Sequence, residues 1–169
     1  AGMLPEKMIA IGFEAPGGPE VLQPQTMPVP NPGEGQVLIK VAYAGVNRPD
    51  VIQRRGLYPP PPGASPIPGL EVAGEIVALG AGVDDIMLGQ QVCALVSGGG
   101  YAEYCLAVAD HCLPVPVDLP LDQAASEVIL VHPVLDEDDR LARPDPVVER
   151  ALIPLPDLIA LGLALSVRP

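Results

Sequence analysis

Aromatic and basic residues are scarce in this 169-residue sequence. Aromatics make up 3% of it, with one Phe and no Trp, so the core has to be built from aliphatic side chains. Lys and Arg number 9 against 21 Asp and Glu, which gives a formal net charge of −12 at pH 7. A chain this acidic repels phosphate backbones and anionic lipid surfaces, so we expect neither a nucleic-acid partner nor a membrane-surface partner.

Long apolar runs and paired cysteines are also missing. No run reaches the roughly 18 apolar residues that a transmembrane helix needs. Residues 1–8 are too short and too polar for a signal peptide. The three cysteines, Cys93, Cys105 and Cys112, are an odd number and form no CxxC motif. A disulfide framework is therefore not expected, and the composition is typical of a protein of the reducing cytoplasm.

A dinucleotide-binding fingerprint is the absence with the largest consequence for function. Such a site needs a GxGxxG turn between a strand and a helix, and the sequence contains none. Residues 80–85 (GAGVDD) lack the third glycine and end in two acids. Only 44 residues follow Ala125, whereas a six-stranded domain of βαβ units, each roughly 30 residues, needs on the order of 150. We therefore expect no Rossmann domain in this sequence, and no cofactor bound by it alone.

Proline and glycine are abundant instead, with 23 and 18 residues. Proline lacks the backbone N–H and glycine raises the entropy cost of a helix, so long helices are excluded. Residues 35–44 alternate in side-chain direction as a strand does. Asn47, Pro49 and Gly56 suit the N-cap, first turn and stop of a short helix. Short strands between Gly/Pro turns predict a mainly β fold with short helices, as a barrel or a sandwich.

Five segments carry a family resemblance. They are residues 12–22 (GFEAPGGPEVL), 41–50 (VAYAGVNRPD), 55–63 (RGLYPPPPG), 68–77 (PGLEVAGEIV) and 98–104 (GGGYAEY). In this order they resemble the zinc-independent quinone oxidoreductases, including zeta-crystallin, of the medium-chain dehydrogenase/reductase superfamily. The resemblance implies that residues 1–125 form a GroES-like substrate domain, which is a partly open β-barrel. For full-length members it implies NADPH as the cofactor and a quinone as the substrate.

The resemblance also points to site residues. Zinc alcohol dehydrogenases of the superfamily have a Cys at the position of Asn47 and a Gly-His-Glu at residues 69–71, which are Gly-Leu-Glu in this chain. Leucine cannot ligate a metal and an amide is a poor zinc ligand, so no metal site is expected. By resemblance, Asn47 and Tyr58 would be the catalytic and cofactor-contacting residues, facing the nicotinamide and the quinone. Each offers a hydrogen-bond donor, an amide NH2 and a phenol OH.

These residues also have simpler interpretations. Asn47 can cap the short helix through its side-chain oxygen, which would leave the amide nitrogen free for a substrate. Tyr58 can pack against the proline loop. Arg48, Arg54 and Arg55 form a basic island, for which a solvated helix face is favoured over a cofactor phosphate contact.

The sulfur-containing residues give no metal pattern. His111 and Cys112 together with Cys105 have a spacing that fits no standard zinc site. Cys93 lies in an apolar strand, where we expect a buried and inert thiol.

The composition changes after about residue 125, and residues 126–169 are treated as a tail. Residues 127–132 predict a buried strand in which His132 is structural. Residues 136–139 are four acids in a row, which indicates a solvated loop because a calcium loop alternates its ligands and contains a Gly.

The rest of the tail leaves two interpretations open. Residues 147–160 weakly resemble the segment that returns from the nucleotide-binding domain in full-length members and completes the barrel domain. Alternatively, they are an unrelated C-terminus. Residues 159–167 alternate large and small side chains, which favours a strand over a helix. We expect self-association, with this strand as an edge.

The sequence supports three functional hypotheses. The first is a GroES-like substrate domain of a quinone oxidoreductase-like protein that is inactive without a nucleotide-binding domain. The second is a working NADPH-dependent quinone oxidoreductase, as one half of a split enzyme or as an oligomer with the cofactor between subunits. The third is a non-enzymatic interaction or structural module.

Overall fold

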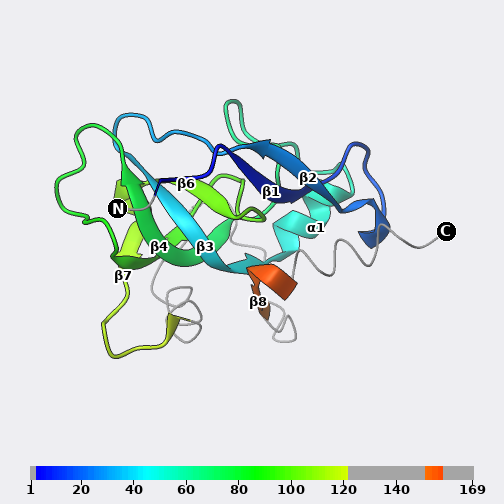
Figure 1. Ribbon diagram of the computed structural model, residues 1–169. Coiled ribbons are helices and arrows are strands. Elements are labelled where there is room, and N and C mark those ends of the chain that lie inside the picture. Colours follow the sequence, from blue (N-terminus) through cyan, green and yellow to red (C-terminus); the bar gives the residue numbers. More distant parts are fainter. Residues whose placement is uncertain (1–2, 122–150, 158–169) are drawn as a thin grey trace, which may run out of the picture.

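The computed structural model describes residues 3–121 and 151–157, and the chain there is mainly β (Figure 1). The strands are β1 (Lys7–Gly12), β2 (Gln23–Pro28), β3 (Gln36–Val46), β4 (Glu71–Leu79), β5 (Gln91–Leu95), β6 (Tyr104–Val108), β7 (Cys112–Pro114) and β8 (Ala151–Pro154). They are accompanied by the short helix α1 (Arg48–Arg54) and by 3-10 turns at Pro19–Val21 and Ala109–His111. This confirms the expected mainly β fold with short helices.

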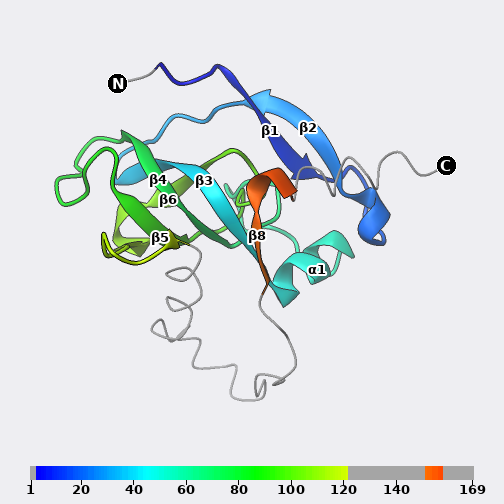
Figure 2. The ribbon, with the colours of Figure 1, turned by 60° about the horizontal axis from the view of Figure 1, so that its bottom comes forward.

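The strands form two antiparallel sheets. β1 pairs with β2, and the larger sheet has the order β6-β3-β4-β5-β7, with β8 pairing β3 outside this path. β3 is the central element because it pairs with β6 through residues 36–40, with β4 along its length, and with β8 through residues 43–46. Figure 2 shows β8 alongside β3 near the start of α1. The chain after residue 150 therefore adds a strand to the sheet formed by the first 121 residues.

The segment before β6 joins the two sheets. Ala10 and Ala102 form an isolated bridge, and the backbone N–H of Ile11 donates to the carbonyl of Tyr101 at 2.7 Å. Glu103 bonds in both directions: its N–H donates to Ile9 and its carbonyl accepts from Val41. β6 itself starts at Tyr104, after the residues that make these contacts.

The core is aliphatic, as predicted. Ile11, Leu38, Ile39 and Ile76 are among the largest fully buried side chains. The close approach of β3 and β4 depends on Gly74, where a Cβ atom would lie 2.0 Å from the carbonyl oxygen of Lys40. A side chain at this position would force the two strands apart.

Several predictions lie outside the described residues. These are the strand at 127–132 with His132, the acidic loop at 136–139 and the strand at 159–167. The described part of the chain contains no helix long and apolar enough to cross a membrane.

Candidate functional site

The site is built around the junction of β3 and α1. Asn47 follows β3 directly and is the N-cap of α1, with extended backbone angles of φ −123° and ψ 161°. The carboxylate of Asp50 accepts a hydrogen bond from the backbone N–H of Asn47 at 2.9 Å, which completes a capping box. The predicted N-cap is therefore confirmed, and the sequence N-R-P-D supplies both halves of it.

The amide of Asn47 is oriented by a buried acid. Its Nδ2 donates to Oε2 of Glu71 at 3.1 Å, and Glu71 is 3% exposed. The expectation that capping leaves this nitrogen free is therefore wrong. Gly45 makes room for the contact, since a Cβ atom at this position would lie 2.5 Å from Oε2 of Glu71. An amide nitrogen carries two hydrogens, so this bond fixes the direction of the second N–H.

Asp50 connects three segments that are distant in sequence. Besides the N–H of Asn47, its carboxylate accepts from the N–H of Gly69 at 3.0 Å and from the hydroxyl of Tyr101 at 3.1 Å. Asp50 is 4% exposed, and burial raises the pKa of its carboxyl group, while these three donors act to lower it. Burial and the neighbouring charge of Asp50 raise the pKa of Tyr101, which therefore remains a phenol able to donate.

The loops at 68–70 and 99–101 pack backbone against backbone. Gly69 has φ +103°, and a Cβ atom there would lie 2.6 Å from the backbone nitrogen of Tyr101. The N–H groups of Gly100 and Tyr101 donate to the carbonyls of Gly69 and Pro68, both at 3.0 Å. This contact places the Tyr101 hydroxyl and the Gly69 N–H on the same carboxylate, and it requires glycine at position 69.

Tyr58 lies in the loop after α1 and is 43% exposed. Among the described residues, the structure records no hydrogen bond between its hydroxyl and the cluster of Asn47, Asp50 and Glu71. Both of its predicted roles, the contact with substrate and cofactor and the packing on the proline loop, stay predictions.

The basic island is divided between surface and interior. Arg48 and Arg55 are exposed, as a solvated helix face requires. Arg54 is only 7% exposed, so the prediction is wrong for this residue. Its backbone carbonyl accepts from the N–H of Gly17, and its charge lowers the pKa of Tyr101, so the guanidinium lies within the electrostatic reach of the buried cluster.

All three cysteines are free and buried, as predicted for Cys93. Burial raises the pKa of Cys93 to about 11, and the charge of Glu71 adds to this effect. Among the described residues, no group of three or more His, Cys, Asp or Glu is placed to hold a metal ion.

The sequence predicted Asn47 and missed Asp50, Glu71 and Tyr101. The capping-box spacing of Asn47 and Asp50 and the acid at the start of an apolar strand, Glu71, were available signals. Tyr101 carried no such signal in the sequence, because its hydrogen-bond partner Asp50 lies 51 residues away.

Comparison with known proteins gives a consistent picture. Residues 33–117 match the alcohol dehydrogenase GroES-like domain family. A quinone oxidoreductase of Lama guanicoe is 44% identical over 122 residues, which cover 70% of this chain and 37% of that protein. The solved quinone oxidoreductase from Coxiella burnetii superposes with a TM-score of 0.65 at 30% identity, covering 71% of this chain and 40% of the other.

A solved mycobacterial protein complexed with NADPH has a TM-score of 0.62 and 39% identity, covering 70% of this chain and 36% of the other. The chain spans about two fifths of the length of the relatives that it matches.

Proposed function

Because this chain belongs to the family of alcohol dehydrogenase GroES-like domains, we propose that it forms the substrate side of a zinc-free quinone oxidoreductase site. The observation that carries the proposal is the amide of Asn47, held by buried Glu71 and by the Asp50 capping box. A rigid, neutral hydrogen-bond donor can stabilise the negative charge that develops on a carbonyl oxygen, and it does so without a metal. Leu70, which lies between Gly69 and Glu71, cannot ligate zinc.

The nucleotide has to be bound by residues outside the described part of the chain. Within that part, the N-terminus of α1 is the only helix start near the cluster, and the Asp50 carboxylate already caps it. A second anion, such as a pyrophosphate, would be repelled there. The start of α1 therefore does not fit the phosphates of NADPH, and we propose that the 169 residues alone catalyse no hydride transfer.

The first test uses the purified chain with NADPH and 9,10-phenanthrenequinone. We expect neither turnover nor saturable quenching or enhancement of NADPH fluorescence up to about millimolar concentration, which corresponds to binding weaker than about 4 kcal/mol. Micromolar binding with turnover would show that the chain builds a complete cofactor site, and the proposal would then be wrong.

The second test fuses this chain to the part of the Lama guanicoe quinone oxidoreductase that this chain does not cover. We expect NADPH-dependent quinone reduction by the fusion, and a loss of about 100-fold in kcat in its Asn47→Ala variant, since one oriented donor is removed. Arg48→Ala, an exposed neighbour on the same helix, serves as the control and should keep the activity. A fully active Asn47→Ala fusion would exclude the role of the amide.

A further inference from the structure

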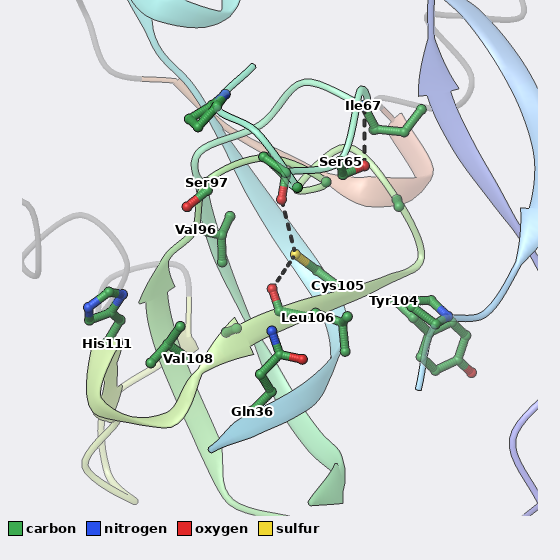
Figure 3. Close-up of a pocket in the computed structure, with 18 of the residues that line it drawn as sticks. Gln36, Ser65, Ile67, Val96, Ser97, Tyr104, Cys105, Leu106, Val108 and His111 are labelled. Atoms are coloured by element: carbon green, nitrogen blue, oxygen red, sulfur yellow. Dashed lines mark hydrogen bonds between the residues drawn. The ribbon is translucent and has the colours of Figure 1, made fainter. Parts of the chain in front are cut away.

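A cavity of about 350 Å³ lies away from the Asn47 cluster, between β6, β2 and the loops at 61–67 and 95–99 (Figure 3). Its lining includes none of Asn47, Asp50, Tyr58 or Glu71. The cavity is therefore separate from the candidate functional site, and a ligand bound in it would be independent of the proposed function. Its volume falls in the range of small-molecule sites, roughly 300–1,000 Å³.

Among the described residues, the lining of the cavity contains no Asp, Glu, Lys or Arg. The sequence contains 30 Asp, Glu, Lys and Arg residues, 21 acidic and 9 basic, yet none of those that the structure describes lines it. Its polar side chains include Gln36, Ser97 and His111. A charged ligand would lose its hydration without gaining an opposite charge, so the walls favour a neutral compound.

The walls also indicate the shape of the ligand. A cavity of roughly 150 Å³ holds benzene, so 350 Å³ suits two fused rings. Met8, Met27 and Cys105 contribute polarizable sulfur, which makes favourable contacts with aromatic rings. Figure 3 shows Ser97 and His111 on the side away from Ile67 and Tyr104, so these two hydrogen-bonding side chains lie toward one end.

Hydrogen bonds hold the walls in place before any ligand binds. The N–H of Ile67 donates to the Ser65 hydroxyl at 3.2 Å, and the N–H of Gly99 donates to the Ile67 carbonyl at 2.7 Å. The thiol of Cys105 faces the carbonyl of Leu106 at 3.4 Å. A ligand would therefore enter a largely formed site, as most small-molecule sites are.

We propose that this cavity binds a neutral bicyclic aromatic compound, with its rings against Met8, Met27 and Cys105 and one hydrogen-bonding group toward Ser97 and His111. The probe for the test is 2-naphthol. The chain contains no Trp, so tryptophan emission does not overlap the fluorescence of the probe. Saturable binding to the full chain is expected, with a dissociation constant below about 1 mM. Naphthalene-2-sulfonate, of the same ring size but anionic, should bind at least about 10-fold more weakly.

Two variants locate the binding. Ala107 is 3% exposed and lines the cavity, so Ala107→Leu should fill it and weaken 2-naphthol binding at least about 10-fold. Val96→Phe fills the cavity from the loop after β5 and replaces the first variant if that one does not fold. Ala78→Leu, on β4 and outside the cavity lining, is the matched control and should bind 2-naphthol as the unchanged chain does.

Three results would overturn the proposal. One is the absence of saturable binding of 2-naphthol up to its solubility. Another is equal binding of the naphthol and the sulfonate, and the third is binding that neither filling variant weakens.

Discussion

At the scale of single residues, two buried acids organise the candidate site. Asp50 and Glu71 are 4% and 3% exposed, and their carboxylates accept hydrogen bonds from backbone N–H groups, a phenol and an amide. A buried charge is stable only when such donors surround it. The acids therefore fix the positions of Asn47 and Tyr101. The orientation of the Asn47 amide depends on the Glu71 carboxylate, and that of the Tyr101 hydroxyl depends on the Asp50 carboxylate.

Asp50→Asn tests this dependence. An Asn side chain has one acceptor oxygen, so either the N–H of Gly69 or that of Asn47 would face its NH2 group and stay unsatisfied. We expect a loss of about 1–3 kcal/mol in the free energy of unfolding, measured by urea denaturation. Asp84→Asn, an exposed position, is the control and should change stability by less than about 0.5 kcal/mol. Equal effects of the two changes would contradict the assigned role.

The thiol of Cys105 gives a prediction on pH. Burial raises its pKa from 9.0 to about 12, so the folded state keeps the proton that the unfolded state loses above about pH 9. Its contribution to stability is therefore intact below pH 9 and is lost progressively between pH 9 and pH 12. Between about pH 8 and pH 10, the unchanged chain should lose about 1.4 kcal/mol more than Cys105→Ala in urea denaturation. Parallel pH curves would show that the thiol is not buried as described.

At the scale of elements, β3 sets the geometry. It pairs with three strands and ends at Val46, directly before Asn47, so the position of the site residues follows from the position of this strand. The contact of β3 with β4 is close enough to require Gly74. The start of β4 carries Glu71, so the distance between these two strands also determines whether Glu71 reaches the Asn47 amide.

Gly74→Ala should push the two strands apart. Its added Cβ atom would lie 2.0 Å from the backbone carbonyl oxygen of Lys40, so the backbone of β3 or β4 would have to shift. We expect destabilisation of about 2–3 kcal/mol, measured as a lowered denaturation midpoint. Gly33→Ala is the control because its new Cβ atom would meet only the end of the Gln36 side chain, at 3.3 Å. A harmless Gly74→Ala change would contradict the described pairing of β3 and β4.

At the scale of the whole molecule, charge is the dominant property. The net charge of −12 at pH 7 makes the folded chain repel itself, and salt screens this repulsion. We expect the thermal unfolding midpoint at pH 7 to rise by a few degrees as NaCl increases from about 10 to about 150 mM. Near the isoelectric point of about 4.3 the same addition should have little effect. A midpoint that is independent of salt at pH 7 would show that the acids are too dispersed to repel.

The sequence by itself determined the features that depend on neighbouring residues. The density of Pro and Gly excludes long helices, the alternation at 35–44 predicts a strand, and Asn47 with Pro49 predicts the start of α1. The chain motifs also indicated the family. All of these are local patterns, because periodicity and capping are set within a few residues.

Only the tertiary structure decided which groups meet. Gly69 and Tyr101 lie 19 and 51 residues from Asp50, and Glu71 lies 24 residues from Asn47. No periodicity spans such separations, so Arg54 was wrongly expected on the surface and the Asn47 amide was wrongly expected to be free. The register of β3 with β4 and the close packing at Gly69 bring these groups together, and both depend on contacts that form only when the chain folds.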